Sequence, residues 1–292
     1  MKNLILALLL LSISCKQTKE TDPVIAAQSD YFSHVKSNDM LLSAPIQGEW
    51  RSEHKERKQT FQNYKSANPN RSIQEKNVIY LQPIGEFSVL QLEALKLTQV
   101  YLSIFFQRKT VINPTISDDI MPKTARRVRN EHTQLLAPYI LDTLLMSKLP
   151  NDGIALMAIT AKDLYPKEDW NYVFGLASYT KKVGVSSIYR LQNVILRSNN
   201  FNRCLERLIN ISSHEIGHMT GISHCVFAYC AMNGSNDLKE TDASPNRLCS
   251  ECQKKLFWNF RYDNNKRLKE LITYFKANSL SRDYNLSMKD LK

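Results

Sequence analysis

The amino-acid sequence predicts an α/β sandwich with a mostly parallel β-sheet, and two observations carry the prediction. From residue 78 onward, short strand-like runs alternate with longer stretches whose apolar residues recur at helical spacing, an order typical of parallel sheets covered by helices. The chain has 292 residues, of which 43% are hydrophobic, and this is enough for one or two domains with a sizeable core. The sequence contains no visible internal repeat or low-complexity tract.

The first fifteen residues are set apart from the predicted fold. A short basic start is followed at residues 4–14 by a largely apolar run, which is too short to cross a bilayer but fits a secretory signal. Residues 11–15, LSISC, resemble a bacterial lipobox. We therefore expect residues 1–14 to be a signal peptide, Cys15 to be lipidated, and the mature protein to be an exported lipoprotein anchored to an envelope membrane. A simple secretory signal with an incidental cysteine is the alternative.

The next segments lead into the main domain. We expect the polar residues 15–30 to form a lipidated tether and residues 31–75 to form an N-terminal extension that packs on the rest. The main domain is expected to span residues 76–277 and to be followed by a C-terminal tail, 278–292. Its first elements are expected to be a strand at 78–82, a helix at 88–106 and a short strand at 110–112.

The second half of the main domain is expected to continue this alternation. Helices are expected where leucine and isoleucine recur at helical spacing, and strands where short apolar runs are bounded by turn residues. The remaining elements are expected in this order: a loop at 114–123, a helix at 130–148, strands at 154–161 and within 172–190, a helix at 201–220, and a helical region at 253–277 that breaks at 263–265.

The stretch from His214 to His224 is the most informative part of the chain. His214 and His218 are four residues apart, so on a helix they stand on one face, one turn apart, and can hold one metal ion together. Gly221 tolerates the positive φ at which a helix can end, so the chain can turn and bring His224 back as a third ligand. Three of the six histidines fall in this stretch, which disfavours a surface helix with unrelated histidines.

This set of side chains predicts an open zinc site. Zinc held by three histidine nitrogens keeps its fourth position for water, and the ion lowers the pKa of that water from about 15.7 toward roughly 7. Glu215 lies beside the ligands and is the expected general base, which takes the proton and passes it to the leaving amine. The motif therefore predicts hydrolysis by a metal-activated water.

Four cysteines follow directly as two close pairs, Cys225 with Cys230 and Cys249 with Cys252. Four thiols in this arrangement fit a closed, tetrahedral zinc site with a structural role. Two disulfides are the alternative, because an exported protein meets an oxidising environment. A bridge between Cys249 and Cys252 would constrain little, so zinc is the favoured interpretation.

Taken together, the run HEIGHMTGISHC, the following VFAYC, Met232 and the later CSEC closely resemble the archaemetzincins, which are zinc metallopeptidase homologues of the metzincin clan. The resemblance implies a metzincin-like zincin fold: a twisted, mostly parallel sheet with an antiparallel edge strand, an active-site helix, and a small C-terminal subdomain that holds a four-cysteine zinc site. Residues 76–277 would then be the metallopeptidase catalytic domain.

The resemblance also implies the roles of individual residues and two Zn²⁺ ions per chain. Met232 would belong to the methionine turn below the catalytic site, where its role is packing. Glu215 would be the general base. The metal ligands would be His214, His218 and His224 for the catalytic zinc, and Cys225, Cys230, Cys249 and Cys252 for the structural zinc.

The resemblance extends upstream to residues 154–166 and 173–177, and to residues 45–64 and 78–85, which look similar to the longer, eukaryote-like members. In metzincins the strand edge above the zinc holds an extended peptide by main-chain pairing, and the matching stretch here is 173–180. We therefore expect a peptide or protein substrate.

The remaining features narrow the function classes. Cys204 has no partner motif and is expected to be a small buried residue. The net charge of +11 is spread along the chain, which favours a solvated basic surface over a dedicated anion site. No nucleic-acid module, P-loop or dinucleotide-binding glycine pattern is present in the sequence, so a nucleic-acid partner is not expected.

Two other functions stay open: a zinc-bound binding module without turnover, and a metal-dependent amidase of the cell envelope. The oligomeric state is left open.

Overall fold

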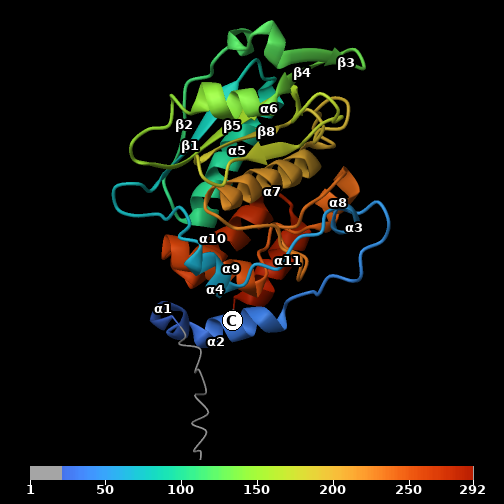
Figure 1. Ribbon diagram of the computed structural model, residues 1–292. Coiled ribbons are helices and arrows are strands. Elements are labelled where there is room, and N and C mark those ends of the chain that lie inside the picture. The colour runs from blue at the N-terminus through green and yellow to red at the C-terminus, as the bar shows by residue number, and fades with distance from the viewer. Residues whose placement is uncertain (1–21, 292) are drawn as a thin grey trace, which may run out of the picture.

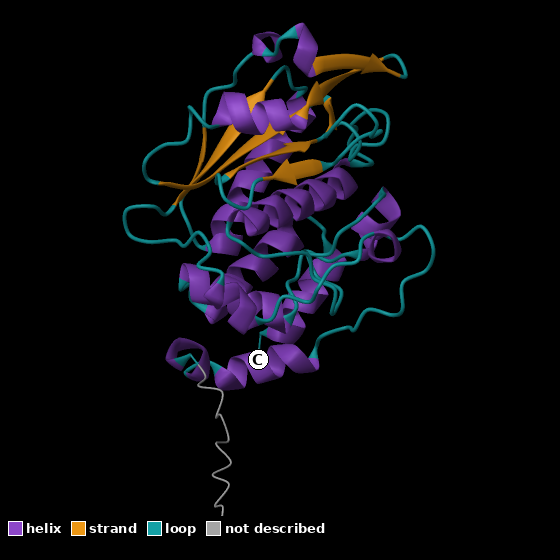
Figure 2. Ribbon diagram, in the orientation of Figure 1, coloured by secondary structure: helices purple, strands orange, loops and turns teal. Residues whose placement is uncertain are grey.

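The computed structural model of this chain describes residues 22–291. The predicted signal peptide and Cys15 lie outside the described residues, so both remain predictions. Figure 2 shows that the strands gather in one half of the molecule, whereas most helices lie in the other half. Figure 1 shows that the long helix α7 (Phe201–Met219) lies between these two halves.

The central sheet has five strands in the order β2-β1-β5-β8-β7. The first four strands are parallel to one another, and the edge strand β7 runs antiparallel to β8. The prediction of an α/β fold is therefore confirmed. The strands are β1 (Val78–Ile84), β2 (Thr110–Ile112), β5 (Gly153–Thr160), β7 (Gly175–Ala177) and β8 (Val183–Ser187).

Strand β5 is buried along its whole length, because helical layers cover both faces of the sheet. Met157 and Ile159 face the larger core, together with α5 (Val89–Phe106) and α7. Leu156 and Ala158 face a second, smaller core on the other side of the sheet. Successive strand residues point to opposite faces, so a continuous apolar run is what a strand between two cores requires.

Helix α5 packs against α7 and the C-terminal helix α10, and it begins with a capping box between Ser88 and Gln91. Ser88 N donates to Gln91 Oε1 over 2.8 Å, and Gln91 N donates to Ser88 Oγ over 3.3 Å. By length and composition alone α5 is apolar enough to cross a membrane, but Leu95, Leu102 and Phe105 are buried in the core of the protein.

The helix predicted at residues 130–148 is wrong in its first half. His132–Leu136 forms strand β4, which pairs with β3 (Arg126–Arg129) and β6 (Asp163–Tyr165) in a separate three-stranded sheet. Pro138 supplies the reason, because proline lacks an N–H and is tolerated only in the first turn of a helix. Helical structure therefore begins at α6 (Ala137–Tyr139) and continues as the π-helix η3 (Ile140–Leu145). The predicted loop at 114–123 contains the 3₁₀ turn η1 (Asp118–Ile120) and the start of η2 (Lys123–Ala125).

The C-terminal region is helical, with the break near the expected position. Arg261 adopts a φ of 53°, and this left-handed residue ends α9 before α10 begins at Asn264. The described part of the predicted C-terminal tail contains a helix, and Asp290 of this helix accepts a hydrogen bond from Arg247 Nε over 2.7 Å. The helices of this region are α8 (Leu238–Ala243), α9 (Ser250–Phe260), α10 (Asn264–Ala277) and α11 (Ser281–Asp290).

The N-terminal extension packs on these helices (Figure 1). The described end of the predicted tether also belongs to the fold: Asp22 accepts hydrogen bonds from Lys65 Nζ at 2.8 Å and Trp258 Nε1 at 3.0 Å, and Ile25 is buried. The short helices of this segment are α1 (Pro23–Ala26), α2 (Ser29–Ser37), α3 (Trp50–Glu53) and α4 (Phe61–Ser66).

Candidate metal centres and active-site cleft

Helix α7 positions two of the three predicted histidine ligands. It is buried from Arg207 to Met219, between α5 on one side and strands β7 and β8 on the other. His214 and His218 face the same side, with ring centroids 4.4 Å apart. The helix ends where Gly221 takes a φ of +85°, as the sequence predicted for the turn.

The turn brings His224 back to the other two histidines. Its ring centroid lies 5.1 Å from that of His214 and 4.7 Å from that of His218. One ring nitrogen from each of the three histidines lies within 4.8 Å of the others. The structure therefore brings together the three side chains that the motif spacing selected.

The hydrogen bonds of the two histidine rings on α7 fit a metal site. His214 Nδ1 donates to Ala231 O at 2.9 Å, and His218 Nδ1 donates to Ile222 O at 2.7 Å. A carbonyl oxygen only accepts, so Nδ1 carries the proton in both rings and Nε2 keeps its lone pair for a metal. Burial, together with the neighbouring His224, lowers the pKa of His214 to about 3, which keeps this ring in the neutral form that binds zinc.

Glu215 lies on α7 next to these ligands and faces the edge strand. Its side chain is buried, and a Cβ atom placed on Gly175 of β7 would lie 2.5 Å from Glu215 Oε1. Only glycine therefore lets the strand pass this close to the carboxylate. Burial raises the pKa of Glu215 to about 8.

Met232 packs against Gly217, the one glycine of α7. A Cβ atom on Gly217 would lie 2.5 Å from Met232 Sδ, and Met232 is buried. Its carbonyl accepts a hydrogen bond from Cys225 N over 2.7 Å. Met232 therefore connects the helix that carries the histidines to the loop that carries the first cysteine.

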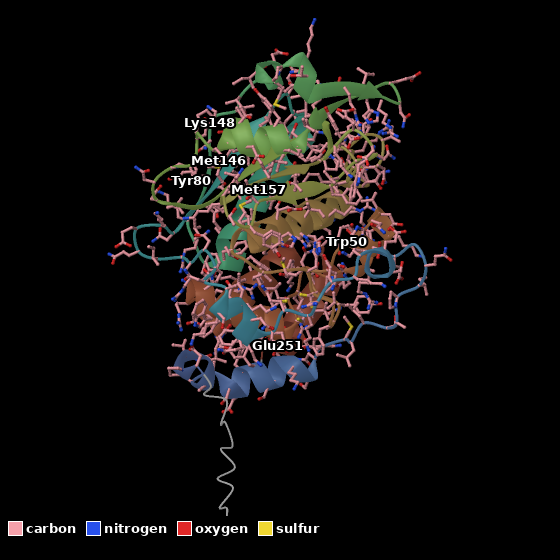
Figure 3. All side chains as sticks on the ribbon, in the orientation of Figure 1. Trp50, Tyr80, Met146, Lys148, Met157 and Glu251 are labelled. Carbon is pink, nitrogen blue, oxygen red and sulfur yellow. The ribbon has the colours of Figure 1, made fainter. Side chains whose placement is uncertain are left out.

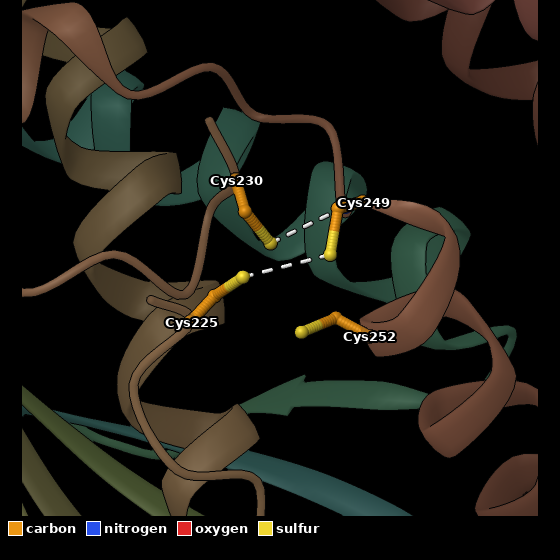
Figure 4. Close-up of side chains that lie close together, drawn as sticks. All are labelled: Cys225, Cys230, Cys249 and Cys252. Atoms are coloured by element: carbon orange, nitrogen blue, oxygen red, sulfur yellow. Dashed lines mark hydrogen bonds between the residues drawn. The ribbon is translucent and has the colours of Figure 1, made fainter. Parts of the chain in front are cut away.

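The four predicted cysteines meet in the interior of the protein. Their sulfur atoms lie within 4.8 Å of one another, and Figure 4 shows all four turned toward a common centre. Cys225 Sγ and Cys249 Sγ are 3.6 Å apart, which matches the separation of about 3.8 Å that two ligands of a tetrahedral site with Zn–S bonds of about 2.3 Å require. Cys249 N also donates to Cys230 Sγ over 3.3 Å. The set fits a closed zinc site. Cys204, in contrast, is buried in the apolar core, as expected.

A cleft of about 690 Å³ opens above the histidines and Glu215. One wall is strand β7 with Phe174 before it, and the floor is α7 with Ile211. Aromatic side chains from α3 and from the loop before β7 complete the lining, namely Trp50, Trp170 and Tyr172. A largely apolar cleft with a few convergent polar groups is the usual form of a ligand site.

Three residues outside the motif also lie against the histidines, and the spacing of the motif does not predict them. Glu56 Oε1 accepts a hydrogen bond from His224 Nδ1 over 2.7 Å. Trp50 lies at the start of α3 beside α8 (Figure 3), with its ring centroid 5.1 Å from that of His224. The ring of Tyr179 lies 4.9 Å from that of His218. The only signal for the first two was the similarity of residues 45–64 to longer archaemetzincins.

Comparisons with known proteins agree with this geometry. The profile of Peptidase family M54 matches residues 119–257. Archaemetzincin-2 of Mus musculus is 32% identical over 250 residues, which cover 74% of this chain and 68% of that protein. An archaemetzincin of Thermococcus kodakarensis is 36% identical over 127 residues, or 43% of this chain and 68% of that one. The crystal structure of archaemetzincin from Methanopyrus kandleri superimposes with a TM-score of 0.50 at 22% identity, covering 65% of this chain and 98% of that chain.

Proposed function

This chain belongs to the archaemetzincin family of zinc metallopeptidases, and from that premise we propose that it hydrolyses peptide bonds in the cleft above α7, with Glu215 as the general base. The observation that carries the proposal is the convergence of three histidines on the floor of a cleft that also holds the buried carboxylate of Glu215. Two of the histidines have Nδ1 bonded to a backbone carbonyl, and the third has Nδ1 bonded to the carboxylate of Glu56. Zinc bound by His214, His218 and His224 would polarise the scissile carbonyl and lower the pKa of water.

Glu215 has the position that proton transfer needs. It is adjacent to His214 in the sequence, lines the cleft, and is buried between α7 and β7. A carboxylate held there is within reach of a water that occupies the open side of the three histidines. Glu215 would accept a proton from that water and deliver it to the amine of the leaving group.

The edge strand β7 is the proposed site for the peptide main chain. Ser178 N donates to Val183 O, and Ser187 N donates to Phe174 O. Because such bonds alternate along an antiparallel pair, the N–H and C=O of Gly175 and Ala177 point away from β8, on the edge that borders the cleft. An extended peptide can therefore add to this edge as a further strand.

The four cysteines are proposed to hold a second, structural zinc, which gives two Zn²⁺ per chain. Support comes from the mutual distances of the sulfur atoms and from their burial in the core next to Met232. Elemental analysis of the purified protein should find two zinc ions per chain, and one after His218→Ala. One zinc in the parent protein and none in His218→Ala would restrict the metal to the histidine site.

We also propose that the protein is an exported lipoprotein anchored through Cys15, on the support of the basic start, the apolar run and the lipobox-like LSISC. Labelled palmitate should enter the protein in a bacterial host and be absent from Cys15→Ser. Equal labelling of both, or of neither, would contradict the anchor.

The peptidase proposal is tested by incubating a diverse peptide mixture with the protein lacking residues 1–15 and reading the products by mass spectrometry. Glu215→Gln keeps the size of the side chain but removes the base, so we expect a loss of about 10²–10⁴-fold in rate with unchanged zinc content. Glu131→Gln, which removes an exposed carboxylate that does not line the cleft, is the matched control. Equal product from the parent and Glu215→Gln, with zinc in both, would favour a binding module or a non-peptide substrate.

A further inference from the structure

A segment of the N-terminal extension runs along the loop that carries His224. We call residues 39–59, between α2 and α4, the strap. Its first part pairs with this loop: Tyr229 N donates to Met40 O over 2.9 Å, and Leu42 N donates to Phe227 O over 3.1 Å. Figure 1 shows the strap passing beside α8 on its way to α4.

Two further attachments hold the strap on either side of its closest approach to the histidines. In the middle, Trp50 N donates to Glu240 Oε1 of α8 over 2.9 Å. At the far end, Gln59 Nε2 donates to Gly221 O over 2.9 Å, and Ser223 N donates to Gln59 Oε1 over 3.2 Å. The strap is therefore bonded to the turn that directly precedes His224.

Between these attachments, Glu56 contacts His224. Glu56 Oε1 accepts from His224 Nδ1 over 2.7 Å, and Glu56 Oε2 accepts from Trp50 Nε1 over 3.3 Å. The indole of Trp50 is itself stacked on His54, with ring centroids 3.7 Å apart. Both oxygens of the Glu56 carboxylate are thus hydrogen-bonded, one to His224 and one to Trp50 of the same strap.

His224 differs from the other two histidines in what orients it. His214 and His218 lie on a buried helix and donate to backbone carbonyls of the motif region, Ala231 and Ile222. His224 lies in irregular chain, and its partner is a side chain 168 residues earlier in the sequence. A carboxylate in this position selects the ring tautomer and raises the basicity of the nitrogen that faces the metal.

We propose that Glu56 is a positioning residue of the histidine metal centre: it fixes the tautomer and orientation of His224, and Trp50 holds Glu56 in place, so that the strap completes the centre. Both residues lie outside the part of the chain that the family profile matches, which begins at residue 119. The inference rests on the proposed function only in requiring that the three histidines bind zinc. It does not require that the protein cleaves peptides.

The test measures zinc affinity at the histidine site, so it does not depend on peptidase activity. Protein treated with dipicolinate is titrated with zinc against a fluorescent zinc indicator, with His218→Ala as the blank for the cysteine site. We expect Glu56→Ala to weaken zinc binding by about 10–100-fold. Glu56→Gln should lose less, because its amide oxygen still accepts from His224 Nδ1. Glu49→Gln removes the same charge from the same strap without contacting a histidine and should bind zinc like the parent.

A double-mutant cycle separates positioning from general support of the fold. If Glu56 acts through His224, then Glu56→Gln should reduce zinc affinity in the parent but cause no further loss in a His224→Ala background. Trp50→Phe, which keeps an aromatic ring but removes the Nε1 donor, should show a smaller loss of the same kind and guards against misfolding of the Glu56 variants. Unchanged affinity in both Glu56 variants, or an equal loss in the His224→Ala background, would overturn the proposal. Failure of the parent to cleave peptides would leave the cycle interpretable and would count only against the proposed function.

Discussion

The last ligand of the histidine site, His224, is followed directly by the first ligand of the cysteine site, Cys225, and yet the two sites are built in opposite ways. The histidines converge on the floor of a cleft, where one side of the site faces the space available to a substrate. The sulfur atoms of the four cysteines converge among buried residues of the apolar core (Figure 4), and four protein ligands would leave no position for water. An open site leaves a position on the metal for water or substrate, as catalysis requires, whereas a closed site can only join segments of the chain.

The two sites also differ in how much of the chain orients them. The cysteine site joins the loop after α7 to the start of α9, and its ligands are surrounded by their own neighbours in sequence and by core residues. The histidine site takes two ligands from α7, one from a loop, and the orientation of that third ligand from the strap. If the proposed structural zinc is bound, the cysteine site would hold the fold together, whereas the histidine site depends on the fold for the orientation of its third ligand.

The largest effect is expected from the closed site. Cys252→Ser should abolish cooperative unfolding or lower Tm by tens of degrees, because apparent zinc-binding free energies of structural sites, about 10–16 kcal/mol in small peptides, contribute directly to folding. His218→Ala, which removes a ligand from the open site, should lower Tm far less. Thermal unfolding followed by circular dichroism measures both.

The same measurement decides between zinc and the disulfide alternative. If zinc holds the four cysteines, a strong chelator should lower the Tm of the parent, and a reductant alone should not. The opposite pattern would mean that disulfides join the two segments. An unchanged Tm for Cys252→Ser would remove the structural role altogether.

A smaller effect is expected at the open site from Gly175→Ala. The added Cβ would lie 2.5 Å from Glu215 Oε1, so the carboxylate must move. Displacement of a catalytic group by about 1 Å costs on the order of 10²-fold in rate, and we expect a loss of kcat of that size with unchanged zinc content and Tm. In a Glu215→Gln background the same substitution should cost little more. A full additional loss there would show that Gly175 acts by some other route than Glu215.

How far the sequence could predict each site follows from the same division. The helical spacing of His214 and His218, the glycine turn and the paired cysteines are local rules, and the structure brings those side chains together. The contact of Glu56 with His224 joins residues 168 positions apart, and no local spacing encodes it. Only the path of the strap, set by its pairing with the loop at Phe227 and Tyr229, places that carboxylate.

The same reasoning explains what the sequence predicted well and badly in the fold. Helix α7 and the alternation that produces the parallel sheet come from periodicity over long segments, which local patterns report reliably. The helix predicted at residues 130–148 was wrong in its first half because leucines at 135 and 136 fit a helical period and a strand equally well. Pairing of β4 with β3 and β6 decides between the two, and that pairing is tertiary.

A moderate effect is expected at the substrate edge. Ala177→Pro removes the N–H that points away from β8, and the loss of one main-chain hydrogen bond of about 1 kcal/mol should raise KM by several-fold to about tenfold, with a smaller change in kcat. Ala177→Ser keeps the N–H and is the matched control. Equal KM for the proline variant and the parent would remove β7 as the peptide site.

The smallest effect is expected where the two sites touch, at Met232. Its side chain fills the space next to Gly217, its carbonyl accepts from Cys225 N, and its N–H donates to Cys230 Sγ over 3.5 Å, so the side chain itself contributes packing and the other contacts come from the backbone. Met232→Leu conserves volume and should cost less than about 1.5 kcal/mol in stability, whereas Gly217→Ala overpacks the same space and should cost about 1–3 kcal/mol. Chemical denaturation measures both, with kcat determined on the same samples. If Met232→Leu lost activity at unchanged stability and zinc content, the sulfur would have a role in the histidine site beyond packing. Met232 would then have to be counted as part of that site.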